Sequence, residues 1–391
     1  MTDRAPASSR PSLKWWARRY SLKHIFYRAR LGARRRRWRA VNSALTAPYR
    51  KSPHAVADSG PVLIVGDFRG TYGLSRGAAY DLAQIRAGHD DCDVLDVGAL
   101  LYRDEAAPPN YIPRRRFGVV YLLCQPDTYG RILPLLDPDQ IKDAYRIGRW
   151  AWETPLFPQA WRFACDLVHE VWAPSEFSAQ VFRQAIDGPV RVYPHPVAAP
   201  IPRPAADRGR FGVADGVFFG LAIMDIQSCP ERKNPWAHVE AWVRAFGDDP
   251  GALLILKIRL GKRTRVVADE LRDMIGKRSN IQLFERDLDD DEITILQASC
   301  DVYLSLHRSE GFGLNIAECL ALDKHVIATH WSANAEYGSA FVRYFGAPYR
   351  LVPYRDWMLH YEDRDFAWAE PDLDAIAHRL QCLRKSTMLG R

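Results

Sequence analysis

The chain has 391 residues, 47% of them apolar, which is enough for two domains with cores of their own. Its charge is uneven, because residues 1–51 hold 15 lysines and arginines against one acid, a net charge of +14, whereas the remainder carries −7. The seven cysteines show no C-x-x-C spacing and no apolar run approaches the ~20 residues that span a bilayer, so the sequence indicates neither a zinc site, nor a disulfide framework, nor a transmembrane helix.

Residues 1–58 form a basic arm followed by a linker. Between residues 12 and 45 the segment has no acid, and aromatic and aliphatic side chains are mixed with arginine and lysine. A helix through 13–31 would be basic and partly amphipathic, so we expect it to bind an anionic membrane surface. A disordered or transit-type tail has a similar composition. The arginines at 34–37 would suit phosphates, but no recognisable nucleic-acid module follows, so we expect no nucleic-acid partner. The prolines, serines and glycine of 46–60 are typical of a linker.

Residues 59–197 alternate between strand and helix patterns, which predicts a first domain. Short apolar runs predict strands within 61–70, 91–98, 117–125, 141–155, 170–185 and 189–197. Helices are expected at 73–88 and after Ser175, a residue type that caps helix N-termini. A proline-rich linker at 198–204 ends this half of the chain.

The same alternation starts again in residues 205–340, which predicts a second domain. Strands are expected at 217–225, 252–259, 280–285, 301–307 and 325–329, and helices at 234–247, 263–276 and 289–300. Residues 341–391 are expected to be a helical segment that packs back on the N-terminal domain. Strand–helix alternation implies parallel sheets, so the sequence predicts an α/β fold of two doubly wound, Rossmann-like domains facing a cleft, with ligands at the carboxyl ends of the strands.

The segment SEGFGLNIAECLAL at 309–322 places two acids around a glycine turn. A helix that follows the turn would direct free backbone N–H groups at an anion, and Gly311 and Gly313 would let a phosphate approach closely. Glu310 and Glu318 would be repelled by that phosphate unless they accept hydrogen bonds from neutral hydroxyls, one from a sugar and one from a ribose. The ligand implied is a nucleotide sugar. The alternative is an ordinary helix cap with two solvated glutamates.

This stretch resembles the E-x7-E motif of the retaining family 4 glycosyltransferases, which have the GT-B fold. The resemblance runs from about 217 to 337 and includes ERKNP at 231–235; it is looser at GDFRGTYG (66–73) and WETPLFP (152–158). RKNP and WETPLFP resemble a branch common in bacterial polysaccharide synthesis. The resemblance implies transfer of a hexose from a nucleoside diphosphate sugar to a glycan or lipid-linked saccharide, without a metal or other cofactor. It also implies a cytoplasmic protein placed peripherally on the inner face of the cytoplasmic membrane.

The resemblance also implies roles for individual residues. Glu318 would bind the donor ribose, Glu310 would contact hydroxyls of the donor sugar, and Lys233 with Arg232 would bind the diphosphate. The other donor-binding candidates are Gly311, Phe312, Gly313, Leu314, Asn315, Lys257 and His307. The candidates for the acceptor side and the loop after the first strand are Arg69, Gly70 and Glu153. We expect His195 to be packed rather than catalytic.

Two departures from the family pattern leave alternatives open. Asp225 stands where many relatives carry an arginine, and residues 322–325 lack the usual glycine. They motivate the alternative of a non-catalytic, membrane-docked sugar-binding or scaffold protein, or of a sugar-nucleotide epimerase. The D-x-D strings, such as 289–291, could suggest a metal site, but acids at a helix start explain 289–291 better, so we expect no metal.

Overall fold

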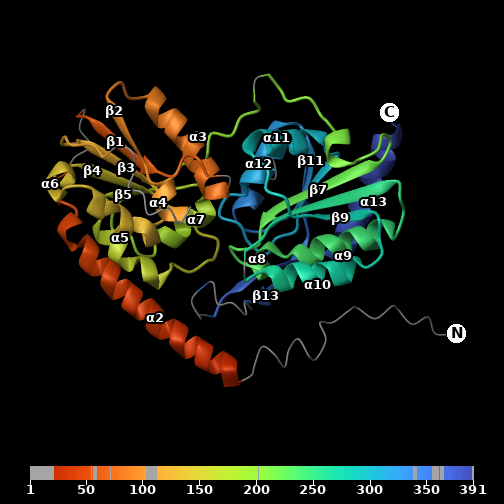
Figure 1. Ribbon diagram of the computed structural model, residues 1–391, viewed down its shortest axis with the longest axis horizontal. Coiled ribbons are helices and arrows are strands. Elements are labelled where there is room, and N and C mark those ends of the chain that lie inside the picture. The colour runs from red at the N-terminus through yellow and green to blue at the C-terminus, as the bar shows by residue number, and fades with distance from the viewer. Residues whose placement is uncertain are drawn as a thin grey trace.

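The computed structural model describes most of the chain, which folds into two α/β domains that lie side by side (Figure 1). The described residues are 22–53, 55, 60–70, 72–102, 112–200, 202–261, 263–337, 341–354, 361 and 365–389, with the backbone alone for 22–31 and 102. The first part of the predicted arm, up to residue 21, lies outside these residues.

The N-terminal domain is built on six parallel strands in the order β2-β1-β3-β4-β5-β6. The strands are β1 (Val62–Gly66), β2 (Cys92–Asp96), β3 (Val119–Leu123), β4 (Tyr145–Arg149), β5 (Glu170–Ala173) and β6 (Val190–Val192). The central strands β1 and β3 are buried along their whole length, as expected for apolar runs in a parallel sheet covered on both faces. The helices are α3 (Gly73–Ala87), α4 (Gly98–Tyr102), α5 (Tyr129–Ile132), α6 (Pro138–Ile141) and α7 (Glu176–Phe182), with 3-10 turns at Pro126–Thr128, Leu133–Leu135 and Gln159–Asp166.

The C-terminal domain repeats this plan with a sheet in the order β12-β11-β10-β7-β8-β9. Its strands are β7 (Phe218–Asp225), β8 (Ala252–Arg259), β9 (Ile281–Phe284), β10 (Val302–Ser305), β11 (His325–Thr329) and β12 (Tyr344–Ala347). Its helices are α8 (Pro230–Lys233), α9 (Pro235–Phe246), α10 (Arg265–Ile275), α11 (Asp290–Ser299) and α12 (Leu314–Ala321), with 3-10 turns at Gly209–Phe211 and Ser332–Tyr337. The predicted fold class is therefore confirmed.

Local sequence explains why these elements begin and pack where they do. Asp289 caps α11, because its side chain accepts from the backbone N–H of Glu292 while Glu292 bonds back to it, so the acids at 289–291 start a helix as predicted. Gly220, in the middle of β7, lies against the ring of Trp242 from α9, and a Cβ at that position would overlap the ring. The contact between Gly220 and Trp242 thus lets β7 and α9 pack closely in the core.

The basic arm contains one long helix, α2 (Leu22–Thr46), which packs on the N-terminal domain. It includes residues 22–31 of the predicted helix and extends further, to Thr46, whereas residues 13–21 of that prediction lie outside the described residues. The Trp38 ring meets the Phe163 ring edge-on at 5.9 Å, and Asn42 is buried. In the described part of the chain no helix has both the length and the apolar character needed to cross a membrane.

The first part of the predicted linker, residues 47–53, is held against the same domain. The Lys51 ammonium donates to the carbonyls of Cys165 (3.1 Å) and Val168 (2.9 Å). The guanidinium of the buried Arg146 donates to the carbonyl of Arg50 (3.0 Å). A linker pattern indicates a lack of periodic structure but does not reveal such distant partners.

The C-terminal segment differs from the prediction in two ways. It contains an antiparallel hairpin of β13 (Tyr349–Pro353) and β14 (Ala367–Pro371) as well as the helix α13 (Leu373–Leu389). The helix packs on α9 of the C-terminal domain rather than on the N-terminal domain, whereas Tyr361 of the same segment meets Trp152 of the N-terminal domain edge-on at 5.4 Å. The buried side chains Ile376 and Leu380 of α13 join the core around β7 and β8, and an Arg384–Asp249 ion pair (2.5 Å) ties the helix there.

The two domains meet at the carboxyl ends of their sheets. Ser175, just after β5, donates its hydroxyl to the carbonyl of Gly311, which follows β10, at 2.8 Å. The backbone N–H groups of Glu176 and Phe177 at the start of α7 donate to the carboxylate of Glu336 (3.1 and 3.0 Å). The strand ends of both domains therefore face a common interface, where the sequence predicted the ligand cleft.

Candidate active site

Arg232 is the central cation of the predicted site. It lies in α8, the short helix after β7, and is 2% exposed. Its guanidinium donates to the carbonyl of Ser309 (3.0 Å) and to the hydroxyl of Ser228 (3.2 Å). Such acceptors are needed because an uncompensated buried charge is costly. Arg232 is therefore fixed in place before any ligand binds.

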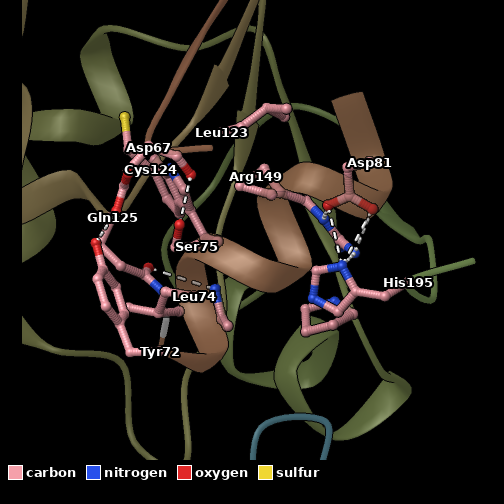
Figure 2. A pocket seen from close by; sticks show the side chains of 14 residues that line it. Asp67, Tyr72, Leu74, Ser75, Asp81, Leu123, Cys124, Gln125, Arg149 and His195 are labelled. Atoms are coloured by element: carbon pink, nitrogen blue, oxygen red, sulfur yellow. Dashed lines mark hydrogen bonds and ion pairs between the residues drawn. The ribbon is translucent and has the colours of Figure 1, made fainter. Parts of the chain in front are cut away.

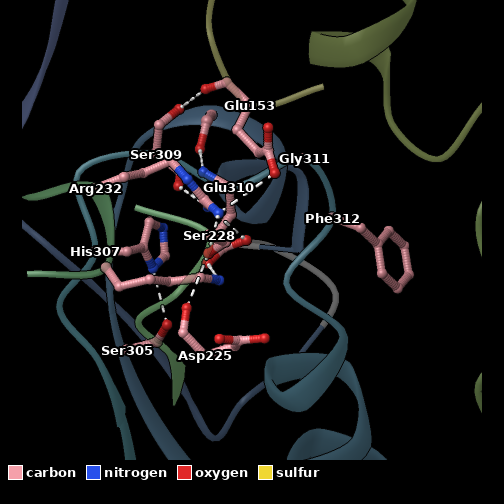
Figure 3. Close-up of polar contacts among 12 residues, drawn as sticks. Glu153, Asp225, Ser228, Arg232, Ser305, His307, Ser309, Glu310, Gly311 and Phe312 are labelled. Carbon is pink, nitrogen blue, oxygen red and sulfur yellow. Dashed lines mark hydrogen bonds and ion pairs between the residues drawn. The ribbon is translucent and has the colours of Figure 1, made fainter. Parts of the chain in front are cut away.

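Glu310 joins this cation from the loop after β10 (Figure 3). Its carboxylate pairs with the Lys233 ammonium and lies 3.3 Å from the Arg232 guanidinium, and its backbone N–H donates to Ser332 (2.8 Å). Burial by itself would raise the pKa of Glu310, but Lys233 and Arg232 outweigh it and lower the pKa to about 2. Glu310 is thus ionised at neutral pH and held in one orientation, which suits a hydrogen-bond acceptor.

Glu153 reaches the same network from the N-terminal domain. Its carboxylate lies 3.3 Å from the Arg232 guanidinium, and its backbone carbonyl accepts a hydrogen bond from the Ser309 hydroxyl. The structure therefore brings four of the predicted site residues together, because Arg232 contacts acids from both domains and Lys233 contacts one of them.

The glycine turn lies at the interface between the domains. Gly311 rests against the backbone of Trp152, with no room for a larger side chain unless Trp152 gives way, and its carbonyl accepts hydrogen bonds from Ser175 and Ser178. Gly313 has φ 84°, a left-handed conformation that favours glycine, and α12 begins at the next residue, Leu314, as predicted.

Phe312, between these glycines, turns away from Glu310 (Figure 3) and toward the N-terminal domain. Its ring stands edge-on to the His195 ring at 5.0 Å, and its carbonyl accepts from the Tyr337 hydroxyl (2.8 Å). The ring thus packs across the interface between the two domains.

Glu318, the second acid of the motif, is 5% exposed and already has partners. The Arg76 guanidinium lies 2.7 Å from one carboxylate oxygen, and the Gln297 amide donates to the other (2.9 Å). Gln297 also donates to Asn315 (3.2 Å), which brings that predicted residue into the same cluster. Burial raises the pKa of Glu318, and Arg76 opposes part of that rise. Arg76 comes from α3 of the other domain and was not among the predicted residues.

His307 and Lys257 occupy supporting positions. The two ring nitrogens of His307 contact the Ser305 hydroxyl and the Asn334 amide oxygen, both at 2.8 Å, and burial lowers its pKa to about 4. This neutral ring is buried near Glu310, on the interior side of the site. Lys257 is buried near the end of β8, where its ammonium lies 3.4 Å from the carbonyl of Ile258 and burial lowers its pKa.

Asp225, the departure from the family pattern, has a cation of its own. Arg259, its partner in the β7–β8 register, lies 3.6 Å from the Asp225 carboxylate. The same guanidinium lies over the ring of Tyr72 from the N-terminal domain, 5.5 Å from the ring centre. The negative charge of Asp225 is therefore balanced at the cleft.

The loop after β1 has a backbone held by a hydrogen bond and an exposed arginine side chain, that of Arg69. The Gly70 N–H donates to the Ser75 hydroxyl (2.6 Å), and a Cβ on Gly70 would overlap the ring of Tyr72. The Arg69 side chain is 74% exposed and lies 3.2 Å from Asp96. Arg69 thus projects into solvent at the mouth of the N-terminal domain.

A cavity of about 40 Å³ lies beside this loop, at the ends of β1, β3 and β4 (Figure 2). Its lining includes a buried cluster that the sequence analysis missed, in which Arg149 bonds Asp81 (2.7 Å) and both lie about 3 Å from His195. Burial lowers the pKa of His195, and Phe312 covers its ring, as expected for a packed histidine. The detectable signal was Asp81, an acid on the buried face of α3 between Ala78 and Ile85.

The described residues include no cluster of three or more His, Cys, Asp or Glu side chains that could hold a metal ion. The functional groups that the structure gathers are cations and carboxylates from both domains. Such a set can bind phosphates and hydroxyls.

Comparison with known proteins adds evidence on the fold. No family profile and no curated protein sequence matches the chain. Among solved structures, Anabaena HepE in complex with UDP and glucose matches with a TM-score of 0.58 at 15% identity, covering 84% of this chain and 91% of that one. The chain has the GT-B fold.

Two other structures agree with this conclusion. A glycosyltransferase from Rickettsia africae matches with a TM-score of 0.56 at 15% identity, covering 84% of this chain and 92% of its own. An E. coli trehalose-6-phosphate protein bound to UDP-2-fluoro glucose matches with a TM-score of 0.53 at 8% identity, over 84% and 95% of the two chains. These likenesses at low identity concern the fold alone.

Proposed function

We propose that this chain is a retaining glycosyltransferase that moves a hexose from a nucleoside diphosphate sugar to a hydroxyl of a glycan or lipid-linked saccharide. The observation that carries the proposal is the position of Glu310, held by Lys233 and Arg232 at the interface of two Rossmann-like domains, with Glu318 eight residues further along the chain. Neighbours of the same fold that hold UDP or a UDP sugar support the class of donor. The E-x7-E and RKNP motifs support the family 4 assignment and a role in surface polysaccharide synthesis.

The proposed chemistry needs no metal and no covalent intermediate. The acceptor oxygen attacks the anomeric carbon on the face from which the diphosphate leaves, and the leaving phosphate oxygen takes the acceptor's proton. Negative charge then grows on the diphosphate, where Lys233 and Arg232 can stabilise it in a cleft with little water. Glu310 would accept hydrogen bonds from donor-sugar hydroxyls, and Glu318 from the ribose.

The contacts of the two cations constrain this mechanism. Arg232 and Lys233 are balanced by Glu310 and Glu153, so the four groups are neutral in sum. A diphosphate adds negative charge to this set. Glu153 belongs to the other domain and can withdraw from Arg232 when the domains separate, whereas Glu310 shares the domain of both cations.

The basic arm fits an acceptor that is carried on a membrane. Helix α2 is docked on the N-terminal domain, and the side chains of Arg34, Arg36 and Arg37 on it are exposed. Exposed arginines on a helix are attracted to anionic lipid. We propose that α2 holds the enzyme peripherally on the inner face of the cytoplasmic membrane.

The decisive experiment measures transfer and binding in the same variants. Lys233→Ala should lower kcat by about 100-fold or more, as loss of one charge-stabilising group does, and Glu318→Ala should weaken donor binding. The matched control is Lys277→Ala, which removes a lysine of the same domain from an exposed turn. A thermal-shift screen with UDP-, GDP-, dTDP- and ADP-sugars identifies the donor, since a ligand that binds the native state raises Tm. Full turnover in Lys233→Ala, or no stabilisation by any of these sugars, would contradict the proposal.

A further inference from the structure

The carboxylate of Glu318 already has three protein partners. Arg76 and the Tyr80 hydroxyl contact one oxygen, at 2.7 and 3.4 Å, and Gln297 donates to the other at 2.9 Å. A carboxylate offers about four lone-pair positions, and Glu318 is only 5% exposed, so little room is left for another donor. A ribose that bonds Glu318 through its hydroxyls therefore has to displace one of these partners.

The partners differ in the domain from which they come. Gln297 lies on α11, in the same domain as Glu318, and its contact survives any movement between the domains. Arg76 and Tyr80 lie on α3 of the N-terminal domain, one helical turn apart. The 3.4 Å contact of Tyr80 is long for a hydroxyl hydrogen bond, so Arg76 supplies most of the attraction across the interface.

Arg76 is also placed to hold the domains together. Its guanidinium lies 3.4 Å from Asp290, at the start of α11, so one cation bridges two acids of the C-terminal domain. Its side chain is only 12% exposed, and charge pairs that are shielded from water interact more strongly than surface pairs. Residues on α3 thus hold the two domains together and also occupy the carboxylate of Glu318.

We propose that Arg76 gates the ribose site: from the opposite domain it occupies hydrogen-bonding positions on Glu318 that the donor ribose needs. This inference rests on the proposed function, because it takes Glu318 to be the ribose ligand. Donor binding then requires α3 to withdraw, and affinity for the donor is lowered by the strength of the Arg76–Glu318 pair. Arg76 is accordingly a determinant of donor affinity that lies outside the donor-binding domain.

A first experiment tests the contact without any nucleotide. Arg76→Gln, Glu318→Gln and the double variant of the full chain are compared by thermal unfolding, and their radii of gyration are measured by small-angle scattering. We expect each single variant to lower Tm, the double variant to lower it no further than the larger single effect, and Arg76→Gln to be more extended than the wild type. Arg86→Gln on the exposed side of α3 is the matched control and should change neither quantity. Additive losses in Tm with unchanged scattering would overturn the gate.

A second experiment measures competition with the ribose by titration calorimetry with UDP. Removal of the gate by Arg76→Gln should tighten UDP binding by at least about 5-fold, the low end of typical coupling between sites. The gain should be smaller with 2′,3′-dideoxy-UDP, which lacks the hydroxyls that compete with Arg76 and profits only from the weaker domain closure. UDP binding that Arg76→Gln leaves unchanged or weakens overturns the gate alone. If neither the wild type nor any variant binds UDP, GDP or ADP, both the gate and the proposed function are overturned.

Discussion

Replacing Glu310 by glutamine tests the charge network at the centre of the site, because it removes the charge and keeps the volume of the side chain. The pKa of Glu310 is about 2, compared with an ordinary value of 4.5. At about 1.4 kcal/mol per pKa unit, this difference corresponds to about 3 kcal/mol of stability at neutral pH. The folded chain holds the proton more weakly than the unfolded chain. The stabilisation is therefore fully present above pH 4.5 and is lost as the pH falls through 2.

The expected change in melting temperature follows from the size of the chain. At about 2.1 cal/mol/K per residue, unfolding of 391 residues as one unit gives an entropy near 0.8 kcal/mol/K, so about 3 kcal/mol lowers Tm by about 4 °C. Thermal unfolding of the wild type and Glu310→Gln, followed by circular dichroism at neutral pH and at several values below 4.5, measures both the loss and its pH dependence.

The pH dependence separates this explanation from a general packing defect. The difference in Tm between the two proteins should narrow below pH 4.5, because the wild-type carboxylate gains its proton there while the glutamine has none to gain. Glu240→Gln is the control, since Glu240 pairs across one helical turn with Arg244 and is partly exposed. An equal Tm at neutral pH, or a deficit in Glu310→Gln that stays constant with pH, would refute the reasoning.

Three further predictions concern other parts of the molecule. Asp81→Asn should destabilise the N-terminal domain by about 3–5 kcal/mol, because it leaves the buried Arg149 without its charge partner. Thermal unfolding measures this loss of stability. The control is Arg69→Gln, a change at an exposed side chain, which should have little effect on Tm. Asp289→Ala should cost about 1 kcal/mol through loss of the α11 cap, seen as a lower urea midpoint with an unchanged m-value. Replacing the three exposed arginines within 34–37 by alanine should weaken binding to anionic vesicles by about 100-fold, at roughly 1 kcal/mol per charge. Equal sedimentation of wild type and variant with such vesicles would contradict a role for α2 in membrane binding.

The sheets were the part of the fold most open to prediction from sequence. The run at 217–225 and the observed strand β7 (Phe218–Asp225) nearly coincide, and β11 (His325–Thr329) has the predicted ends. Both strands belong to a parallel sheet, where burial of both faces requires an unbroken apolar run that sequence reveals directly. The packing partner of α13 could not be predicted in this way. Its pattern identifies an apolar face, but it does not show that this face packs on α9.

In the candidate site, several residues were predicted, whereas the contacts between the domains were not. Arg232, Lys233 and Glu310 were predicted together through the resemblance to family 4, and Glu310 also follows a strand end that the sequence locates well. Contacts between the domains were not predicted, since the pairing of Arg76 with Glu318 joins positions 242 residues apart and depends on how the domains close. A buried acid such as Asp81 signals that some cation must be near, but the sequence does not identify that cation.

Each of the two charge clusters at the interface contains an ion pair between the domains. Arg232 of the C-terminal domain contacts Glu153 of the N-terminal domain, and Arg76 of the N-terminal domain contacts Glu318 of the C-terminal domain. A nucleoside diphosphate sugar would need the first cation for its phosphates and the second acid for its ribose. A single separation of the domains releases both groups, because each pair has one member on either side. The two contacts are therefore not independent competitors of the donor. The free energy of domain closure lowers the affinity for both ends of the donor together.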